Sequence, residues 1–528
     1  MRENSAEDLK LVEMSLQNAD EEWSGGGPCS PGANGDYNTV VQSSPQCEAG
    51  SGEGVTSCVE DESWQGVWKT FVYSTVAVMC QVTFGYDVGA VSQCLEPIGE
   101  AFGLTTLEVG FVTSALNYCA AVGALAVSGL LLDRVGRRGS LVVASILLVG
   151  GGVAVAGATS YSTLVVGRLL QGLGVGASWA ASGIYVTEIA QSGRRGQLVA
   201  LVDVAINLGI VLGYIVAYII DTGDVGRSLG VAPWRVAMGV SVVPPLLFAV
   251  VSPWLPESPR WLVSKGRVTQ ANKAIHRLKA STASEASVAD ALEKLRRDQQ
   301  RAAQAAPTTD GDNGDDGWLN ALRSHRGQYA ALLGVAQQAT GTEAILYFAP
   351  TVLPSGNKFD AFLGNVGIGL AKFGGEVVAS YLSDSPKIGR RTMMIGGNVG
   401  VALGLVVFGV LVMLPGDQTV PMILALSFIM LAFSLGPGPF TTVFVNECVP
   451  TDIRGKSSAI SCFLNRITSA CVALSFLPLS KDLGAAPVFF GYAAIAAAAT
   501  ALYAATLPNT LGLSLEQIEA QSHHAALV

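Results

Sequence analysis

Seven charged side chains stand well inside long apolar stretches of this sequence, away from the ends of those stretches. They are four acids and three bases: Asp87, Asp203, Glu343, Glu376, Arg168, Lys372 and Arg466. A charge at the centre of a lipid bilayer costs at least about 2.5–3.5 kcal/mol, so an ionisable group kept there usually serves a function. If all four acids were ionised, one negative charge would lack a base. One protonated carboxyl would remove that imbalance, because a low dielectric disfavours the charged form.

The stretches that position these residues are long enough to cross a membrane. Of the 528 residues, 50% are hydrophobic and only 14% are charged, whereas soluble domains carry about 25% charged residues. A helix needs about 20 apolar residues to cross the hydrocarbon core. The sequence predicts an all-α membrane protein with twelve transmembrane helices, over 68–93, 108–132, 140–160, 163–187, 197–220, 233–255, 327–353, 359–383, 392–414, 420–447, 455–479 and 485–507.

Basic clusters fall in every second loop between these helices. The clusters are Arg134/Arg137/Arg138, Arg194/Arg195, the bases from Arg260 to Arg326, Lys387/Arg390/Arg391 and Arg454/Lys456. Loops rich in Lys and Arg stay on the cytoplasmic side of a membrane. Both chain termini are therefore predicted to be cytoplasmic.

In this topology Asp87 and Arg168 lie at matching depth, each in the outer third of its helix. They could therefore form a pair. A carboxyl that binds a proton in one conformation and releases it in another is what a proton-coupled carrier needs. Asp87 is our candidate for that proton site, with Arg168 as its partner. The alternative is a permanent structural ion pair.

One pattern of residues occurs twice. Gly136-Arg137-Arg138 recurs as Gly389-Arg390-Arg391, and Glu188…Arg194 recurs as Glu447…Arg454. Two similar membrane halves usually hold a ligand between them and rock against each other. Opposite charges on facing halves could latch an inner gate in one state, or could only anchor helices at the membrane interface. The predicted cytoplasmic gate residues are Asp133, Arg137, Arg138, Glu188, Arg194, Glu257, Arg260, Asp384, Arg390, Arg391, Glu447 and Arg454.

Charge and hydropathy divide the chain into five parts. Residues 1–66 carry 13 Asp/Glu and 2 Lys/Arg, which predicts a disordered acidic cytoplasmic tail. The remainder is nearly balanced in charge, so nucleic acid is not an expected partner. The other parts are an N-terminal six-helix half over 67–256, a cytoplasmic helical loop over 257–326, a C-terminal six-helix half over 327–508 and a tail over 509–528.

The sequence predicts no metal site, no cofactor and no catalytic centre. Its nine cysteines are spread singly, at spacings that match no metal motif. The four histidines, His276, His325, His523 and His524, lie in the predicted loop or tail, away from any apolar stretch that holds a nucleophile. We therefore expect that the protein is not an enzyme.

Six motifs occur in order at the expected helix ends. They are Phe84-Gly85-Tyr86-Asp87, Asp133…Gly136-Arg137-Arg138, Gly167-Arg168, Pro256-Glu257-Ser258-Pro259-Arg260-Trp261-Leu262, Gln337-Gln338…Thr340-Gly341 and Gly436-Pro437-Gly438-Pro439. Through them the chain resembles the sugar porter family of the major facilitator superfamily, from about residue 68 to 520. The resemblance implies the major facilitator fold in a lipid bilayer and transport of a hexose or polyol by alternating access. It also implies proton symport, because several proton-coupled members use the acid at Asp87 with the arginine at Arg168.

A sugar site should be polar, mostly uncharged and walled by aromatic rings. Amide side chains both donate and accept hydrogen bonds, and Gln337, Gln338 and Asn465 fit this role together with Tyr347. Phe84 and Phe433 are candidates for apolar walls. The alternative is that these polar residues only join neighbouring helices.

The chain departs from the common hexose carriers of the family at three predicted substrate positions. Asp203 and Glu343 replace Gln and Asn, and Thr442 replaces a Trp. In having these two acids together with Lys372 and Asn465-Arg466, the chain is similar to the polyol/monosaccharide transporter branch of the family. A carboxylate can accept two hydroxyl hydrogen bonds, which suits vicinal diols. The alternative is a charge network remote from the substrate, formed by Asp203, Glu343, Lys372, Glu376 and Arg466.

Two other functions remain open at this point. An uncoupled sugar facilitator would use the same fold with a fixed Asp87–Arg168 pair. A membrane sugar sensor would bind sugar and barely transport it. For a carrier of this kind we expect the plasma membrane as its location.

Overall fold

The computed structural model describes residues 64–508, apart from gaps at 127–130, 192–193, 224, 229, 280–283, 306–315, 354–357, 383–388 and 450–452. The predicted C-terminal tail and nearly all of the predicted N-terminal tail lie outside these residues. Within the described residues every regular element is a helix.

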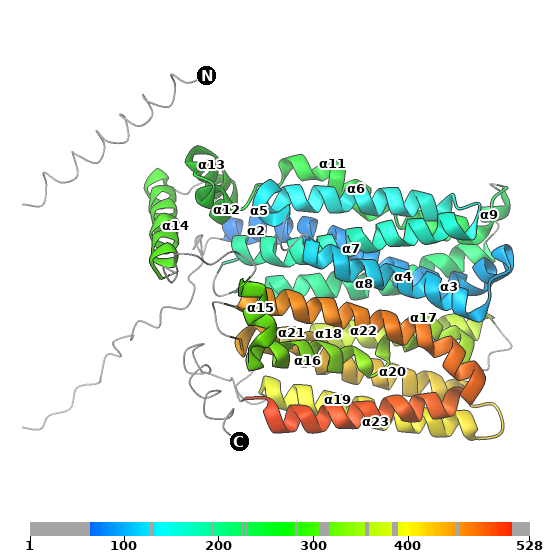
Figure 1. Cartoon of the computed structure of the whole chain (residues 1–528). Helices are drawn as coiled ribbons and strands as arrows, with labels where there is room; N and C mark the ends of the chain where they lie inside the picture. Colours follow the sequence, from blue (N-terminus) through cyan, green and yellow to red (C-terminus); the bar gives the residue numbers. More distant parts are fainter. Residues whose placement is uncertain are drawn as a thin grey trace, which may run out of the picture. The chain divides into compact units, whose positions relative to one another are not determined.

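The N-terminal half begins with a long helix that is interrupted at Val78, and Figure 1 labels its two parts α2 and α3. Its helices are α2 (Trp64–Ala77), α3 (Met79–Phe102), α4 (Thr106–Ala126), α5 (Leu132–Val135), α6 (Arg137–Ala156), α7 (Tyr161–Ile189), α8 (Arg195–Thr222), α9 (Val225–Ser228), α10 (Pro233–Val240) and α11 (Val243–Val251), followed by a short 3-10 turn at Ser252–Trp254.

Four shorter helices join the halves, and the C-terminal half follows them (Figure 1). The joining helices are α12 (Pro259–Ser264), α13 (Val268–Leu278), α14 (Glu285–Ala305) and α15 (Asp316–Arg323). The C-terminal half comprises α16 (His325–Ala339), α17 (Thr342–Val352), α18 (Lys358–Leu382), α19 (Arg390–Met413), α20 (Thr419–Leu435), α21 (Pro437–Glu447), α22 (Arg454–Leu483) and α23 (Ala485–Thr506). The end of the helices at which α12–α15 connect is called the loop side below.

Nine helical stretches in the described residues are long and apolar enough to cross a membrane. They coincide with nine of the twelve predicted spans. The other three spans are helical too. The first contains a break at Val78, the seventh contains a break between α16 and α17, and α18 carries Lys372 and Glu376 in its middle.

Helices α3 and α8 pack backbone to backbone because each presents two glycines four residues apart. A Cβ added to Gly85 would lie 1.8 Å from the Ile206 carbonyl oxygen, and one added to Gly209 would lie 2.3 Å from that of Val82. Gly89 and Gly213 meet the partner helix in the same way. Small residues at this spacing allow the close helix approach that is common in membranes.

The break between α16 and α17 depends on Gly341. Its φ of +79° is a conformation that residues with a Cβ rarely adopt. A Cβ at this position would also lie 2.5 Å from the ring of Tyr492 in α23. Glycine therefore permits the break, which places Gln337 and Gln338 just before it and Glu343 just after it.

The two halves pack against each other mainly away from the loop side. The principal contacts between them join α4 to α22, α8 to α18 and α3 to α17. Tyr214 of α8 donates a hydrogen bond to the Leu346 carbonyl oxygen of α17 at 2.9 Å. By contrast, α16 and α21 pack mainly on helices of their own half. Each is the loop-side part of a divided span, which α16 shares with α17 and α21 shares with α20.

Candidate functional site

Asp87 of α3 and Arg168 of α7 form an ion pair in the interior of the N-terminal half. The two residues are 1% and 0% exposed. Arg168 Nη1 donates to Asp87 Oδ2, and its Nε donates to the Val112 carbonyl oxygen of α4 at 3.1 Å. The pairing expected from their matching depth is confirmed.

This ion pair is not fully satisfied. Asp87 Oδ1 and Arg168 Nη2 are buried without a hydrogen-bond partner among the described residues. Gln171, one turn after Arg168, accepts a longer contact from Arg168 Nη1 at 3.4 Å. A buried charged group with an unused donor or acceptor is costly, so the pair has capacity for another partner.

A second polar cluster forms around Asn465 of α22. Asn465 Nδ2 donates to Gln337 Oε1 at 2.6 Å and to the Gly334 carbonyl oxygen at 3.0 Å. Asn465 Oδ1 accepts from Arg466 Nη2 at 2.7 Å and from Gln338 Nε2 at 3.5 Å. The structure thus brings together three amides that the sequence predicts for substrate binding.

The two adjacent glutamines have different surroundings. Gln337 Nε2 donates to the carbonyl oxygens of Pro437 and Gly438, at 2.8 and 2.9 Å, across the break between α20 and α21. Its oxygen is taken by Asn465, so its amide is fully engaged. In contrast, Gln338 Oε1 is buried and has no partner among the described residues. Gln338 is therefore the glutamine with an acceptor left for a ligand.

Glu343 and Arg466 connect this cluster to the other half. Arg466 Nη1 lies 3.5 Å from Glu343 Oε1, while Glu343 Oε2 has no partner among the described residues. The Arg466 guanidinium stands 4.7 Å from the Trp179 ring and 5.8 Å from the Phe84 ring, both in the N-terminal half. A guanidinium within about 6 Å of a ring is attracted to its face. Phe84 is thus next to the cluster, as its predicted role as a wall requires.

Tyr347 lies between the two polar clusters. Its hydroxyl accepts from Asn117 Nδ2 of α4 at 3.4 Å, and it interacts electrostatically with Glu343, Arg168, Asp87 and Arg466. Asn117 Oδ1 is buried and without a partner among the described residues. Sequence reasoning missed Asn117 and Trp179, because a lone amide or ring in an apolar helix has no distinguishing pattern.

Four more polar residues face one another between α8 and α18. Lys372 Nζ donates to Asn207 Oδ1 at 2.7 Å, and Glu376 also hydrogen-bonds the Asn207 side chain. Asp203 interacts electrostatically with Lys372 and Arg466. The five residues of the predicted charge network therefore adjoin the Asn465 cluster. The charge network and the predicted substrate residues together form one polar region.

The remaining predicted substrate residues differ in their positions. Phe433 of α20 is buried, and its ring lies 5.8 Å from Lys372 Nζ. Thr442 of α21 is exposed, and its side chain has no hydrogen bond to the other predicted substrate residues in the described structure.

The loop-side ion pairs join helices within each half. Arg137 donates to Glu188 at 2.7 and 2.8 Å, and lies 3.7 Å from Asp133. Glu257 Oε1 accepts the backbone N–H groups of Arg137 and Arg138 at 2.9 and 3.1 Å, at the N-terminus of α6. A carboxylate is favoured there by the helix dipole.

In the C-terminal half, Arg390 pairs with Glu447, and Arg391 donates to the Ala504 carbonyl oxygen at 2.7 Å. Arg194 is exposed, and Arg260 is partly buried. Asp384 and the side chain of Arg454 lie outside the described structure. A latch between the halves stays a prediction.

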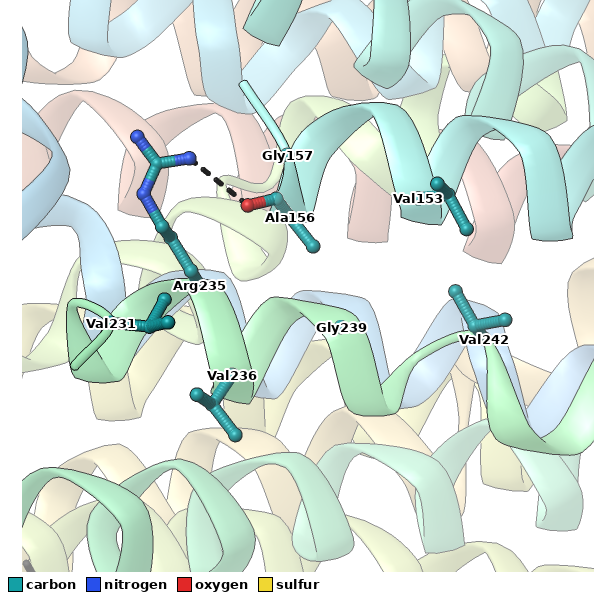
Figure 2. A pocket seen from close by; sticks show the side chains of 8 residues that line it. All are labelled: Val153, Ala156, Gly157, Val231, Arg235, Val236, Gly239 and Val242. Carbon is teal, nitrogen blue, oxygen red and sulfur yellow. Dashed lines mark hydrogen bonds between the residues drawn. The ribbon is translucent and has the colours of Figure 1, made fainter. Parts of the chain in front are cut away.

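The structure has an open apolar groove elsewhere, of about 450 Å³. Figure 2 shows it between α6 and α10, lined by Val153, Ala156, Gly157, Val231, Arg235, Val236, Gly239 and Val242. Arg235 Nη1 donates to the Ala156 carbonyl oxygen at 3.0 Å. The groove contains none of the predicted substrate residues and lacks paired donors and acceptors, so we do not assign it to a sugar.

Comparison with known proteins gives a consistent result. Residues 68–521 match the family model for "Sugar (and other) transporter". The chain is 32% identical to Probable polyol transporter 6 of Arabidopsis thaliana, over 84% of this chain and 92% of that protein. These relatives are transporters rather than enzymes.

Solved structures agree on the fold. The chain is similar to the major facilitator superfamily proton:xylose symporter XylE bound to 6-bromo-6-deoxy-D-glucose, and to the inward open conformation of XylE from E. coli. Each match has 26% identity and a TM-score of 0.71, and covers 86% of this chain and 99% of XylE. The helices thus have the twelve-helix major facilitator architecture of an integral, multi-pass membrane protein. The chain belongs to the sugar (and other) transporter family.

Proposed function

We propose that this protein carries a hexose or polyol across a membrane by alternating access, in symport with a proton that binds Asp87. The observation that carries the proposal is the buried Asp87–Arg168 pair with its unused oxygen and nitrogen. If Arg168 turns to another acceptor, Asp87 loses its compensating charge and takes up a proton.

The position of Tyr347 supports coupling between proton and sugar. The buried Tyr347 lies within electrostatic range of Asp87 and Arg168 and also of Glu343 and Arg466. A sugar that reorganises the hydrogen bonds of Glu343 or Gln338 would therefore change the surroundings of the proton site. Polar networks of this kind respond as a unit.

The unused acceptors favour a ligand rich in hydroxyl groups. Gln338 Oε1, Glu343 Oε2 and Asn117 Oδ1 are acceptors, and Arg466 is a donor nearby. A polyol or sugar carries neutral O–H donors, which these three acceptors could bind. The names of the relatives, a polyol transporter and a proton:xylose symporter, agree with this substrate class.

The packing of the halves supports an inward-facing state. The halves meet at α4–α22, α8–α18 and α3–α17, away from the loop side. The basic residues of the loops favour a cytoplasmic position for the loop side and for both termini. Rocking of the halves would then open the opposite side. We propose the plasma membrane as the location.

The test is sugar-dependent proton movement in proteoliposomes. Internal pH is followed while glucose, sorbitol or myo-inositol is added outside. We expect acidification with at least one of them, and loss of that acidification in Asp87→Asn. Glu96→Gln is the matched control, because Glu96 is exposed on the same helix and the substitution removes the same charge.

Other outcomes would decide between the alternatives. Uptake of labelled sugar without a pH change in the wild type would make the protein an uncoupled facilitator with a structural Asp87–Arg168 pair. Binding of these sugars without uptake would make it a sensor.

A further inference from the structure

The acids between α8 and α18, the buried Glu376 and the partly buried Asp203, outnumber the base that they share. Asp87 is paired with Arg168, and Glu343 lies 3.5 Å from Arg466. Among the seven charged groups of the membrane interior, this leaves Asp203 and Glu376 with Lys372 alone. Neither acid has an ion pair with Lys372 in the described structure, where Lys372 Nζ bonds Asn207 instead.

The register of the two helices sets Asp203 opposite Glu376. Asn207 of α8 faces Lys372 of α18. Tyr218, further along α8, stacks on Phe362, earlier in α18, with ring centroids 3.9 Å apart. The helices are therefore antiparallel. One turn back along α8 is Asp203, and one turn forward along α18 is Glu376, so the two carboxyls occupy the next facing position.

In the described part of the chain, the surroundings do not supply a second free positive charge. Asp203 and Lys372 are the charged groups that act most strongly on Glu376, and Lys372 and Arg466 of α22 are those that act most strongly on Asp203. Arg466 is balanced by Glu343. The backbone of α21, which carries no charge, lies next to Glu376. Glu376 Oε2 is 3.5 Å from the position that a Cβ on Gly438 would take. Glu376 is 5% exposed.

We propose that Asp203 and Glu376 form a second proton-binding site, which holds one shared proton while α8 packs on α18. The proton forms an O–H bond on one carboxyl, and one negative charge remains to balance Lys372. Two like charges in a low dielectric cannot both be kept at small cost. The site belongs to both halves, because α8 is in the N-terminal half and α18 in the C-terminal half (Figure 1).

The shared proton would make the stability of the contact between the halves depend on pH. Its place in a transport cycle rests on the proposed alternating access. When rocking separates α8 from α18, water reaches both carboxyls and the shared proton can leave. The protonated pair therefore favours the closed α8–α18 contact, and alkaline pH weakens it.

The test is infrared difference spectroscopy on the purified, reconstituted protein, which requires no transport. We expect a carbonyl band of a protonated carboxyl at neutral pH that disappears in Asp203→Asn and, separately, in Glu376→Gln. In each variant the remaining acid balances Lys372 and needs no proton. Lys372→Met should keep or strengthen the band. Asp87→Asn and Glu96→Gln are the controls, and both should retain it.

The outcomes separate this site from the proposed symport. A wild type without the band, or a band that persists in both Asp203→Asn and Glu376→Gln, would overturn the second site whatever the transport assay shows. A band that behaves as expected in a protein that moves no protons with sugar would support the second site and reject Asp87 symport. Thermal melting and size-exclusion chromatography check that each variant is folded.

Discussion

At the scale of single residues, the structure gives adjacent side chains different tasks. Gln337 donates its amide hydrogens to the Pro437 and Gly438 carbonyl oxygens, and its own oxygen accepts from Asn465. Gln338 makes one long contact at 3.5 Å and keeps a free oxygen. The first residue holds the α20–α21 break in place, and the second is available to a substrate hydroxyl.

Substitution of the two glutamines should therefore have separable effects. Gln338→Ala should weaken sugar binding by about 0.5–1.5 kcal/mol, the net value of one hydrogen bond, and leave thermal stability nearly unchanged. Gln337→Ala should lower the melting temperature as well as the affinity, because the Pro437 and Gly438 carbonyl oxygens lose the hydrogen bonds that the Gln337 amide donates to them. Titration calorimetry and melting in the same detergent measure both quantities. Equal losses of stability in the two variants would contradict the division of tasks.

At the scale of elements, close contact between helices depends on glycine. The four glycines of α3 and α8 let the two backbones touch, and α8 thereby presents Asp203 and Asn207 to α18. Gly341 divides one span into α16 and α17 and so separates the glutamines from Glu343. Backbone packing thus decides which side chains reach the polar region.

The α3–α8 contact should not tolerate a side chain. Gly209→Val would place a Cβ 2.3 Å from the Val82 carbonyl oxygen. Overpacking of a well-packed contact costs about 1–3 kcal/mol or more. We expect a lower melting temperature and a smaller folded fraction in size-exclusion chromatography. Gly183→Ala is the matched control, since its Cβ would meet nothing within 4 Å. A Gly209→Val protein as stable as the control would show that the contact is not tight.

At the scale of the whole molecule, the principal contacts between the two halves in the described residues lie away from the loop side. The contacts α4–α22, α8–α18 and α3–α17 close the side opposite the loops. The loop-side ion pairs, Arg137–Glu188 and Arg390–Glu447, stay within their halves. This distribution is what one state of a rocking carrier requires.

Labelling of an introduced cysteine tests which side is open. Thr442 is exposed in α21, so Thr442→Cys should react with a charged, membrane-impermeant thiol reagent from the loop side, above the labelling of the parent protein. A disulfide between Tyr218→Cys and Phe362→Cys should abolish transport and leave this labelling intact, because those rings already touch, with centroids 3.9 Å apart. Labelling from the opposite side alone would contradict an inward-facing state.

The sequence by itself determined the class of the molecule. Long apolar stretches, the repeated Gly-Arg-Arg pattern and ordered motifs such as Gln337-Gln338 predicted a helical carrier with two halves. Hydropathy is a local property, so it can be read from consecutive residues. The sequence also predicted the pairing of Asp87 with Arg168, because the depth of a residue in the membrane follows from its position along its helix.

The tertiary structure decided which groups remain unpaired. A count of charges shows one acid in excess, but only the contacts Asp87–Arg168 and Glu343–Arg466 assign that excess to Asp203 and Glu376. Helix rotation and register determine these contacts, and composition does not encode them. The same holds for Asn117 and Trp179, which enter the polar region through packing between halves that are far apart in the chain.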